Sequence, residues 1–231
     1  MALEASKVSA DFRKVVGVGS LGTVYTGTFR GEKCAVKVFN KGVIQRDVVQ
    51  NYDIASIIQH HPNVVLVHGL WYGNPANRLP NNDPALVMEL CTMSLDAYIK
   101  EKVDKGEVAV FRLEKQLEIL NGVTSGMIYL HSKRIIHGDL SAKKVLLSFG
   151  GPSNDKTILA KVAGVCQMKL FTPDTVLWHQ TSVQRSGIMP PEVKDSGEDV
   201  ELTEAVDVFS FGCLIAHVAS CVYPVPNTKG M

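Results

Sequence analysis

The chain has 231 residues, of which 45% are hydrophobic and 20% are charged, as is usual for a globular protein. This composition excludes a disordered tail, a collagenous repeat and a small disulfide scaffold. The 24 Lys and Arg residues nearly balance the 23 Asp and Glu residues, leaving a formal charge of +1. Because the chain carries no strong basic field, we expect no nucleic acid among its partners.

The cysteines and the ends of the sequence favour a cytoplasmic protein. The five cysteines are scattered, odd in number and mostly inside apolar stretches, which indicates reduced thiols. The first residues contain no apolar core of the kind that a signal peptide needs. Residues 208–223 form a charge-free run, but it is shorter than the roughly 18–20 residues that span a bilayer. We therefore expect a cytoplasmic location and no membrane span.

The first 90 or so residues have the pattern of β-strands. Residues 12–39 alternate β-branched and small side chains, and residues 64–72 and 85–90 form two further apolar runs. Helical spacing predicts a short helix at 43–58, which ends before a proline. Residues 73–84 are rich in proline and asparagine and predict a surface loop.

After residue 95 the pattern becomes mainly helical, with two short strands predicted at 145–148 and 158–162. A helix at 206–220 is apolar on nearly every side, so we expect it to be buried at the centre of this part. Together these elements predict an α+β protein in two lobes. One face of a further long helix is marked, at helical spacing, by Leu113, Leu117, Leu120, Thr124, Met127 and His131.

Four short motifs carry the chemistry. A G-x-G-x-x-G-x-V run at residues 17–24 lies between two predicted strands, so the dinucleotide-binding fingerprint does not apply, and turn geometry alone could explain its glycines. Lys37 lies on the next apolar strand, where an ammonium needs a partner such as a phosphate. The other motifs are IHGDLSAKKVLL at 136–147, IMPPEV at 188–193 and DVFSFG at 207–212.

In this order and spacing, the motifs resemble those of a eukaryotic protein kinase domain. The resemblance implies one kinase-like domain over residues 1–231, with an N-lobe and hinge at about 12–91 and a partial C-lobe at about 92–231. The residues after Asp139, Leu-Ser-Ala-Lys, are similar to the tyrosine-kinase and tyrosine-kinase-like branch.

The resemblance also implies an ATP site. Val24 and Ala35 would cover one face of the adenine ring and Leu146 the other, although all three could equally be ordinary core residues. Residues 89–91 would form the hinge, and Asp139 matches the catalytic base, here perhaps only a vestige of one held as a structural residue. The candidate nucleotide-binding residues are Gly17, Gly19, Gly22, Val24, Ala35, Lys37, Met88, Glu89, Cys91, Lys144 and Leu146.

Two departures affect the metal that the resemblance implies. Gly164 stands where the family has the aspartate that holds magnesium, and a glycine has no side chain to ligate it. Lys144 stands where the family has an asparagine that supplies a second ligand, and an ammonium donates but cannot accept. We therefore expect no bound metal and poor magnesium binding.

Two further departures concern charge pairing. The helix glutamate that pairs with Lys37 in the family is replaced by Asn51 or Tyr52, and no glutamate occurs between residues 33 and 84. Gly138 replaces the arginine that holds a phosphorylated activation loop. The C-lobe also ends early, so Glu192 lacks the arginine with which the family pairs it.

These departures predict a pseudokinase, which binds ATP weakly, transfers phosphate weakly or not at all, and acts on protein partners as a signalling scaffold or regulator. Two alternatives stay open. One is an active ATP-dependent protein kinase with atypical metal handling. The other is a structural interaction module that binds no nucleotide.

Overall fold

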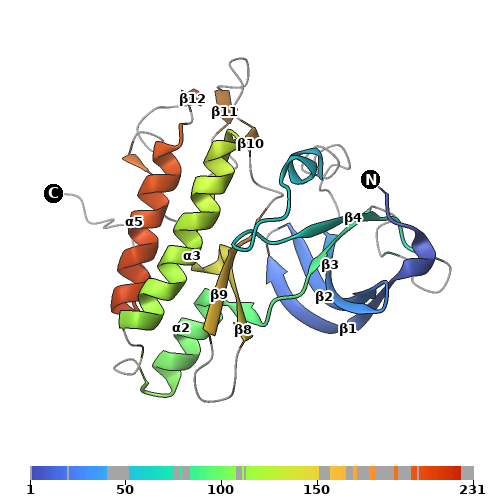
Figure 1. Ribbon diagram of the computed structural model, residues 1–231, viewed down its shortest axis with the longest axis horizontal. Coiled ribbons are helices and arrows are strands. Elements are labelled where there is room, and N and C mark those ends of the chain that lie inside the picture. Colours follow the sequence, from blue (N-terminus) through green and yellow to red (C-terminus); the bar gives the residue numbers. More distant parts are fainter. Residues whose placement is uncertain are drawn as a thin grey trace. The chain divides into compact units, whose positions relative to one another are not determined.

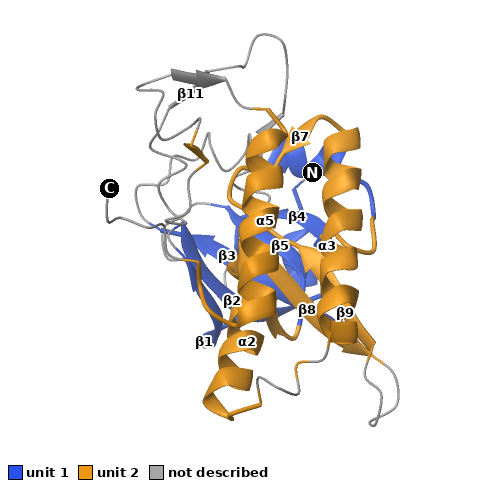
Figure 2. Cartoon of the chain, turned by 90° about the vertical axis from the view of Figure 1, so that its left-hand side faces the viewer, with its two compact units in different colours: residues 1–60, 65–91 blue, residues 61–64, 92–231 orange. Residues whose placement is uncertain are grey.

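The computed structural model divides the chain into two compact units, which Figure 2 colours separately. Unit 1 comprises residues 1–60 and 65–91, and unit 2 comprises residues 61–64 and 92–231. The predicted α+β, two-lobe class is confirmed, with a β-rich first unit and a mainly helical second one. The structure describes residues 2–19, 21–40, 52–74, 79, 84–107, 111, 113–150, 157–164, 169–170, 177–179, 190–191, 199–201 and 203–224.

Unit 1 is built on a five-stranded antiparallel sheet with the strand order β1-β2-β3-β5-β4 (Figure 1). Arg30 and Gly31 join β2 to β3 with φ angles of 53° and 87°, which is the pattern of a two-residue type I′ hairpin. The three predicted strand regions are confirmed. The strands are β1 (Val8–Gly19), β2 (Gly22–Phe29), β3 (Glu32–Phe39), β4 (Val67–Trp71) and β5 (Ala85–Glu89).

The core of unit 1 lies on one face of this sheet and includes Val36, Val87 and the fully buried Trp71. The N-terminal segment, which the sequence did not predict as part of the sheet, closes this core. Leu3 N–H donates to the Leu70 carbonyl at 2.7 Å, and a short 3-10 helix, η1 (Ala5–Lys7), leads into β1. The N-terminal residues thus add to the edge of the sheet at β4.

Two predictions in unit 1 are tested only in part. Residues 52–57 are helical, as predicted, whereas residues 41–51 of the predicted helix lie outside the described residues. The predicted loop at 73–84 is described only at 73, 74, 79 and 84, none of which belongs to a helix or a strand of more than one residue.

Unit 2 contains three helices of ten residues or more among its described parts, α2 (Leu95–Asp104), α3 (Leu113–Ser132) and α5 (Ala205–Ser220). Its largest described sheet has the order β6-β8-β9, and both predicted strands, now β8 and β9, are confirmed. Ser94 caps α2, because its Oγ accepts from Ala97 N–H at 3.2 Å. The remaining elements are β6 (Met93–Ser94), β7 (Ile135–Ile136), η3 (Ala142–Lys144), β8 (Val145–Gly150), β9 (Thr157–Val162), β10 (Lys169–Leu170), β11 (Leu177–His179) and β12 (Asp199–Glu201).

The predicted buried face of α3 is wrong. Leu113 and Leu117, which mark it, are 67% and 48% exposed. The helix instead packs on β9 and on Asn63, and a Cβ at Gly126 would come within 2.4 Å of the Asn63 carbonyl. The buried stripe therefore follows small residues, which a count of large apolar side chains cannot detect. It consists of Ile119, Val123, Gly126, Met127 and Leu130.

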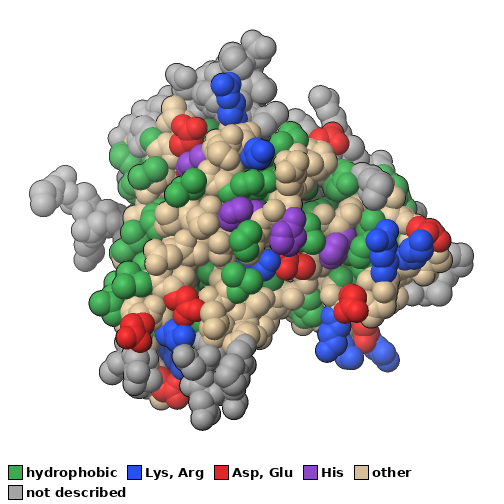
Figure 3. Space-filling model, in the orientation of Figure 1, with side chains coloured by type: hydrophobic (Ala, Val, Ile, Leu, Met, Phe, Trp, Pro, Cys, Tyr) green, Lys and Arg blue, Asp and Glu red, His purple; other side chains and the backbone are tan. Residues whose placement is uncertain are grey.

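The prediction that the helix at 206–220 is buried on all sides is also wrong. α5 lies beside α3 in the opposite direction (Figure 1), but Val208 is 65% exposed and Ile215 is 42% exposed. Described elements pack against only one side of α5, so its other apolar side chains reach the surface at the left of Figure 3. No helix within the described residues is long and apolar enough to cross a bilayer.

Candidate functional site

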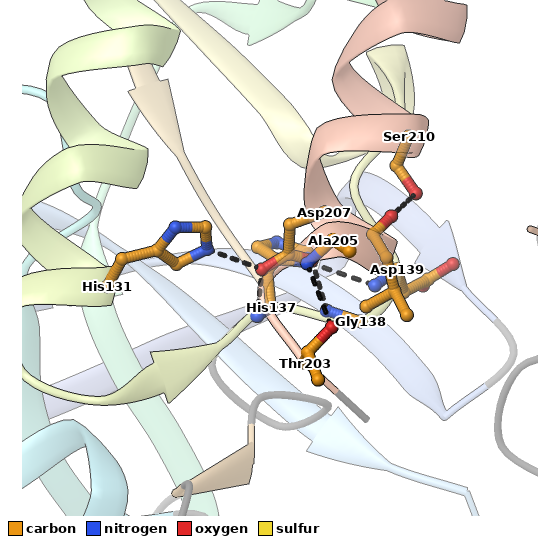
Figure 4. Close-up of polar contacts among 9 residues, drawn as sticks. His131, His137, Gly138, Asp139, Thr203, Ala205, Asp207 and Ser210 are labelled. Atoms are coloured by element: carbon orange, nitrogen blue, oxygen red, sulfur yellow. Dashed lines mark hydrogen bonds and ion pairs between the residues drawn. The ribbon is translucent and has the colours of Figure 1, made fainter. Parts of the chain in front are cut away.

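In unit 2 the site is organised by Asp207, an acidic residue in the first turn of the apolar helix α5. Its side chain is 1% exposed, and a carboxylate so deeply buried must be fully hydrogen-bonded. Asp207 Oδ2 accepts from His137 N–H at 2.8 Å, and Oδ1 accepts from Gly138 N–H at 2.8 Å. His131 Nε2, at the end of α3, lies 2.8 Å from Oδ2 (Figure 4). Asp207 thus fixes the backbone that leads to Asp139.

His137 carries this order onward to the next segment of the site. Its Nδ1 accepts from Asp139 N–H at 3.1 Å, so the ring proton resides on Nε2, which donates to the Ala163 carbonyl at 2.8 Å. Complete burial lowers the pKa of this imidazole because it disfavours the charged form. His137 is therefore a neutral link between Asp139 and the residue before Gly164.

Asp139, the residue that matches the catalytic base, already has a cationic partner. Lys144 Nζ lies 3.2 Å from Asp139 Oδ2, and the two side chains are 25% and 7% exposed. Between them the chain makes the single 3-10 turn of η3, in which Lys144 N–H donates to the Ser141 carbonyl at 2.8 Å. The turn brings residues five apart in sequence together, and the ammonium neutralises the carboxylate.

Gly164 lies against the same group. Its φ is +112°, a region that side chains rarely adopt, and a Cβ there would lie 3.3 Å from His137 Nε2 and 3.4 Å from Lys144 Cδ. Magnesium takes oxygen ligands, and neither glycine nor lysine offers a side-chain oxygen at these two positions. Among the described residues, no group of three or more His, Cys, Asp or Glu side chains is placed to hold a metal ion. The side chains at positions 144 and 164 thus do not fit the magnesium site that the resemblance implies.

In unit 1 the predicted nucleotide residues of β2, β3 and β5 share one face of the sheet. Val24 pairs with Lys37 and Ala35 pairs with Met88, and residues 35 and 37 are two apart on β3. Because side chains alternate along a strand, all four point to the same side. The core side chains of β3 occupy the opposite face. The structure thus brings these four candidates together on the face that the core of unit 1 does not use.

Lys37 forms no ion pair with any carboxylate that the structure describes; its Nζ lies 5.2 Å from the centre of the Phe39 ring. Of the residues considered for the position of the helix glutamate, Tyr52 is half-buried, Asp53 is exposed, and Asn51 and Asp47 lie outside the described residues. The expected absence of a helix partner for Lys37 therefore holds for the described part of the helix.

The three glycines of the loop differ from one another. A Cβ at Gly22 would come within 2.1 Å of the Val38 carbonyl, so packing against β3 requires a glycine there. At Gly17 and Gly19 the nearest atoms would lie 4.0 and 3.7 Å away, and none of the three has a positive φ. The interpretation of these glycines as turn residues is therefore wrong for Gly17 and Gly19, since neither turn geometry nor packing within the described residues requires them.

The predicted hinge begins at a structural contact. Glu89 N–H donates to the Leu66 carbonyl at 3.0 Å, and Glu89 Oε1 accepts from Leu66 N–H at 2.7 Å. Leu90 and Cys91 are half-buried at the end of unit 1. Leu146, on β8 of unit 2, is half-buried, whereas its neighbour Leu147 is fully buried.

Sequence reasoning missed part of the site. It placed the motif at 207–212 only as the start of a helix and assigned no role to Asp207, His131 or His137. The signal was present, because an aspartate in an otherwise apolar helix needs buried donors. Pro190 and Pro191 of the Pro-Glu motif are described, whereas Glu192 and the candidate phosphorylation sites at 172–186 lie outside the described residues.

Comparisons with known proteins agree with this geometry. Residues 10–230 match the family described as protein tyrosine and serine/threonine kinase. Similar curated proteins include cysteine-rich receptor-like protein kinase 2 of Arabidopsis thaliana, 31% identical over 94% of this chain and 31% of the relative. Phytosulfokine receptor 1 of the same plant is 28% identical over 96% of this chain and 21% of its own length. The serine/threonine-protein kinase/endoribonuclease IRE1 of Oryza sativa subsp. japonica is 28% identical over 88% and 23%. The chain therefore spans less than a third of the length of these relatives.

Proposed function

Because this chain belongs to the protein tyrosine and serine/threonine kinase family, we propose that it is a pseudokinase. It binds ATP weakly and without magnesium, transfers phosphate weakly or not at all, and acts as a scaffold or regulator of signalling through protein partners in the cytoplasm. The Leu-Ser-Ala-Lys sequence after Asp139 supports a place in the tyrosine-kinase-like branch.

The observation that carries this proposal is the contact between Lys144 and Asp139 beside a glycine at position 164. Phosphoryl transfer depends almost entirely on positioning and on neutralising phosphate charge, chiefly with metal ions. A base whose carboxylate is paired with an ammonium is poorly placed to accept a proton from a substrate hydroxyl. Loss of both metal-ligand side chains removes the second requirement.

The nucleotide part of the proposal is supported by unit 1. Val24, Ala35, Lys37 and Met88 share a sheet face that combines apolar side chains with one ammonium, as an adenine ring and a phosphate require. Gly17 and Gly19 are not required by local packing, which supports a role in letting a phosphate approach the backbone.

Magnesium is expected to weaken this binding. The carboxylate of Asp139 is already paired with Lys144, so Lys37 supplies the main charge contact for the phosphates. Chelated ATP carries less negative charge than free ATP, and the chain offers no new metal ligands in return. Lys37→Ala should therefore reduce ATP affinity more than Asp139→Ala does.

A second candidate, an active kinase with atypical metal handling, is favoured by one observation. Asp139 is retained, and relatives carry the names of serine/threonine kinases. A structural interaction module without nucleotide is the remaining alternative.

One experiment separates these three functions. Autophosphorylation and transfer to a generic substrate are measured with magnesium or manganese, with Asp139→Asn as the control, beside a thermal-shift titration with ATP. We expect no transfer above the Asp139→Asn background, together with ATP stabilisation that does not need magnesium. Transfer that Asp139→Asn abolishes supports the active kinase, and the absence of any ATP shift supports the interaction module.

A further inference from the structure

The two departures from the kinase pattern at residues 144 and 164 touch each other. The ammonium of Lys144 lies 3.2 Å from Asp139 Oδ2, and the Cδ of the same lysine lies 3.4 Å from the position of a Cβ on Gly164. The stem of the lysine thus passes over the glycine while its charged end reaches the aspartate. One side chain connects the position of one lost metal ligand with the remaining carboxylate.

The backbone explains why these residues meet. Val145 and Val162 are paired in the β8–β9 hairpin, and beyond that pair Ala163 N–H donates to the Lys144 carbonyl at 2.7 Å. The hairpin register therefore places residue 144 beside residues 163 and 164. The η3 turn places the same residue beside Asp139.

We infer that Lys144 is a built-in counterion that takes the place of a divalent metal at Asp139, and that Gly164 makes room for its stem. The two substitutions form one unit, so changing either residue alone cannot rebuild a metal site. The ligand class, a metal-free nucleoside triphosphate, rests on the proposed function, whereas the coupling between the residues can be measured without nucleotide.

Charge and space support this inference. Asp139 is 7% exposed, and a nearly buried carboxylate is stable only with a charged or hydrogen-bonding partner. In Gly164→Asp the new carboxylate would lie close to Lys144 and pair with that ammonium. In Lys144→Asn the counterion is lost, but position 164 still lacks an oxygen. Only Lys144→Asn with Gly164→Asp supplies two new ligands beside Asp139.

The first test is a double-mutant cycle on the full chain without nucleotide. Lys144→Met keeps the stem and removes the charge, and Asp139→Asn removes the carboxylate charge. We expect Lys144→Met to lower the thermal midpoint by roughly 3 °C or more in the Asp139 background and by much less in the Asp139→Asn background. Lys143→Met, at the exposed neighbouring lysine of η3, is the matched control. Equal losses in both backgrounds would overturn the inference.

The second test measures the change in thermal midpoint caused by ATP, with magnesium and with EDTA, in wild type, both single variants and the double variant. We expect only the double variant to gain a magnesium-dependent increase, of about 3 °C. A similar gain in Lys144→Asn alone, or in wild type, contradicts the inference. If no variant responds to ATP, the nucleotide function fails, and the double-mutant cycle still decides the role of Lys144. If the double variant does not fold, the same cycle decides it.

Discussion

The two halves of the kinase site have been treated differently in this chain. In unit 1, Val24, Ala35, Lys37 and Met88 share a sheet face that the core of the unit does not use, and Lys37 has no described carboxylate partner. In unit 2, Asp139 is paired with Lys144. Asp207, His137 and Gly138 are likewise joined by internal hydrogen bonds.

The difference teaches that retained motif residues do not all report the same thing. In unit 1 the conserved types of residue keep groups available for a ligand. In unit 2 the polar groups satisfy one another, so Asp139 can be retained for structural reasons alone. Substitutions in unit 2 should therefore change stability first, and substitutions on the unit 1 face should change binding first.

The largest effect is expected for Asp207→Ala. It leaves the buried N–H groups of His137 and Gly138 without an acceptor, and each such loss costs about 1–3 kcal/mol. We expect a loss of about 4 kcal/mol in the free energy of unfolding, measured by urea denaturation. Ser210→Ala, one turn further along α5, removes only a hydroxyl bond to the Val206 carbonyl and serves as the control. A loss below about 1 kcal/mol for Asp207→Ala would show that the loop is held by other contacts.

Two glycines of the same loop should separate stability from binding within unit 1. In Gly22→Ala the new methyl group would meet the Val38 carbonyl at 2.1 Å, so strand β2 must shift, and we expect a loss of about 3 kcal/mol. In Gly17→Ala the nearest side-chain atom lies 4.0 Å away, so we expect stability within about 0.5 kcal/mol of wild type and weaker ATP binding. Denaturation and ATP titration of both variants check this. A large stability loss in Gly17→Ala would restore the structural interpretation of that glycine.

The same comparison can be made between two helix glycines of unit 2. A Cβ at Gly126 of α3 would lie 2.4 Å from the Asn63 carbonyl, whereas a Cβ at Gly212 of α5 would meet nothing within 4 Å among the described residues. We expect Gly126→Ala to destabilise by about 2 kcal/mol and Gly212→Ala to stabilise by about 0.5–1 kcal/mol. Opposite signs in urea denaturation support the packing of residues 61–64 on α3. A stabilising Gly126→Ala contradicts it.

A smaller effect should appear with pH. Burial lowers the pKa of His137 below its ordinary value near 6.5, so the unfolded chain binds a proton at a higher pH than the folded one does. The stability contributed by the neutral ring is then complete above about pH 6.5 and is lost as the pH falls. We expect a loss of about 1 kcal/mol between pH 7 and pH 5.5. His217 and His68, whose pKa values burial also lowers, add in the same direction, so His137→Gln should reduce the slope without abolishing it. An unchanged slope in that variant would mean that His137 is not neutral in the fold.

The strands could be predicted from the sequence because β-branched residues alternate over 12–39 and run continuously over 64–72 and 85–90. The missing metal ligands were also readable, since Gly164 and Lys144 are visible as residue types at motif positions. The ion pair between Lys144 and Asp139 was not, because it depends on a 3-10 turn whose geometry no motif encodes.

The helix faces failed for a related reason. Hydrophobic spacing selects the side with Leu113 and Leu117, but the close approach of Asn63 at Gly126 decides which side is buried. That contact joins residues far apart in sequence, and a glycine contributes nothing to a hydrophobic pattern. The role of the N-terminal residues at the β4 edge was missed similarly, because a single parallel bridge between Ala2 and Leu70 leaves no alternating pattern.

The central claim is that unit 1 can still bind a triphosphate while unit 2 no longer needs a metal. Isothermal titration calorimetry of ATP into the full chain, in EDTA and in magnesium, tests it most directly, with Lys37→Ala as the reference variant. We predict binding in EDTA that magnesium leaves equal or weaker, and at least a roughly tenfold loss of affinity in Lys37→Ala, which corresponds to about 1.4 kcal/mol. Binding that occurs only with magnesium, and that Lys37→Ala does not weaken, would contradict the account.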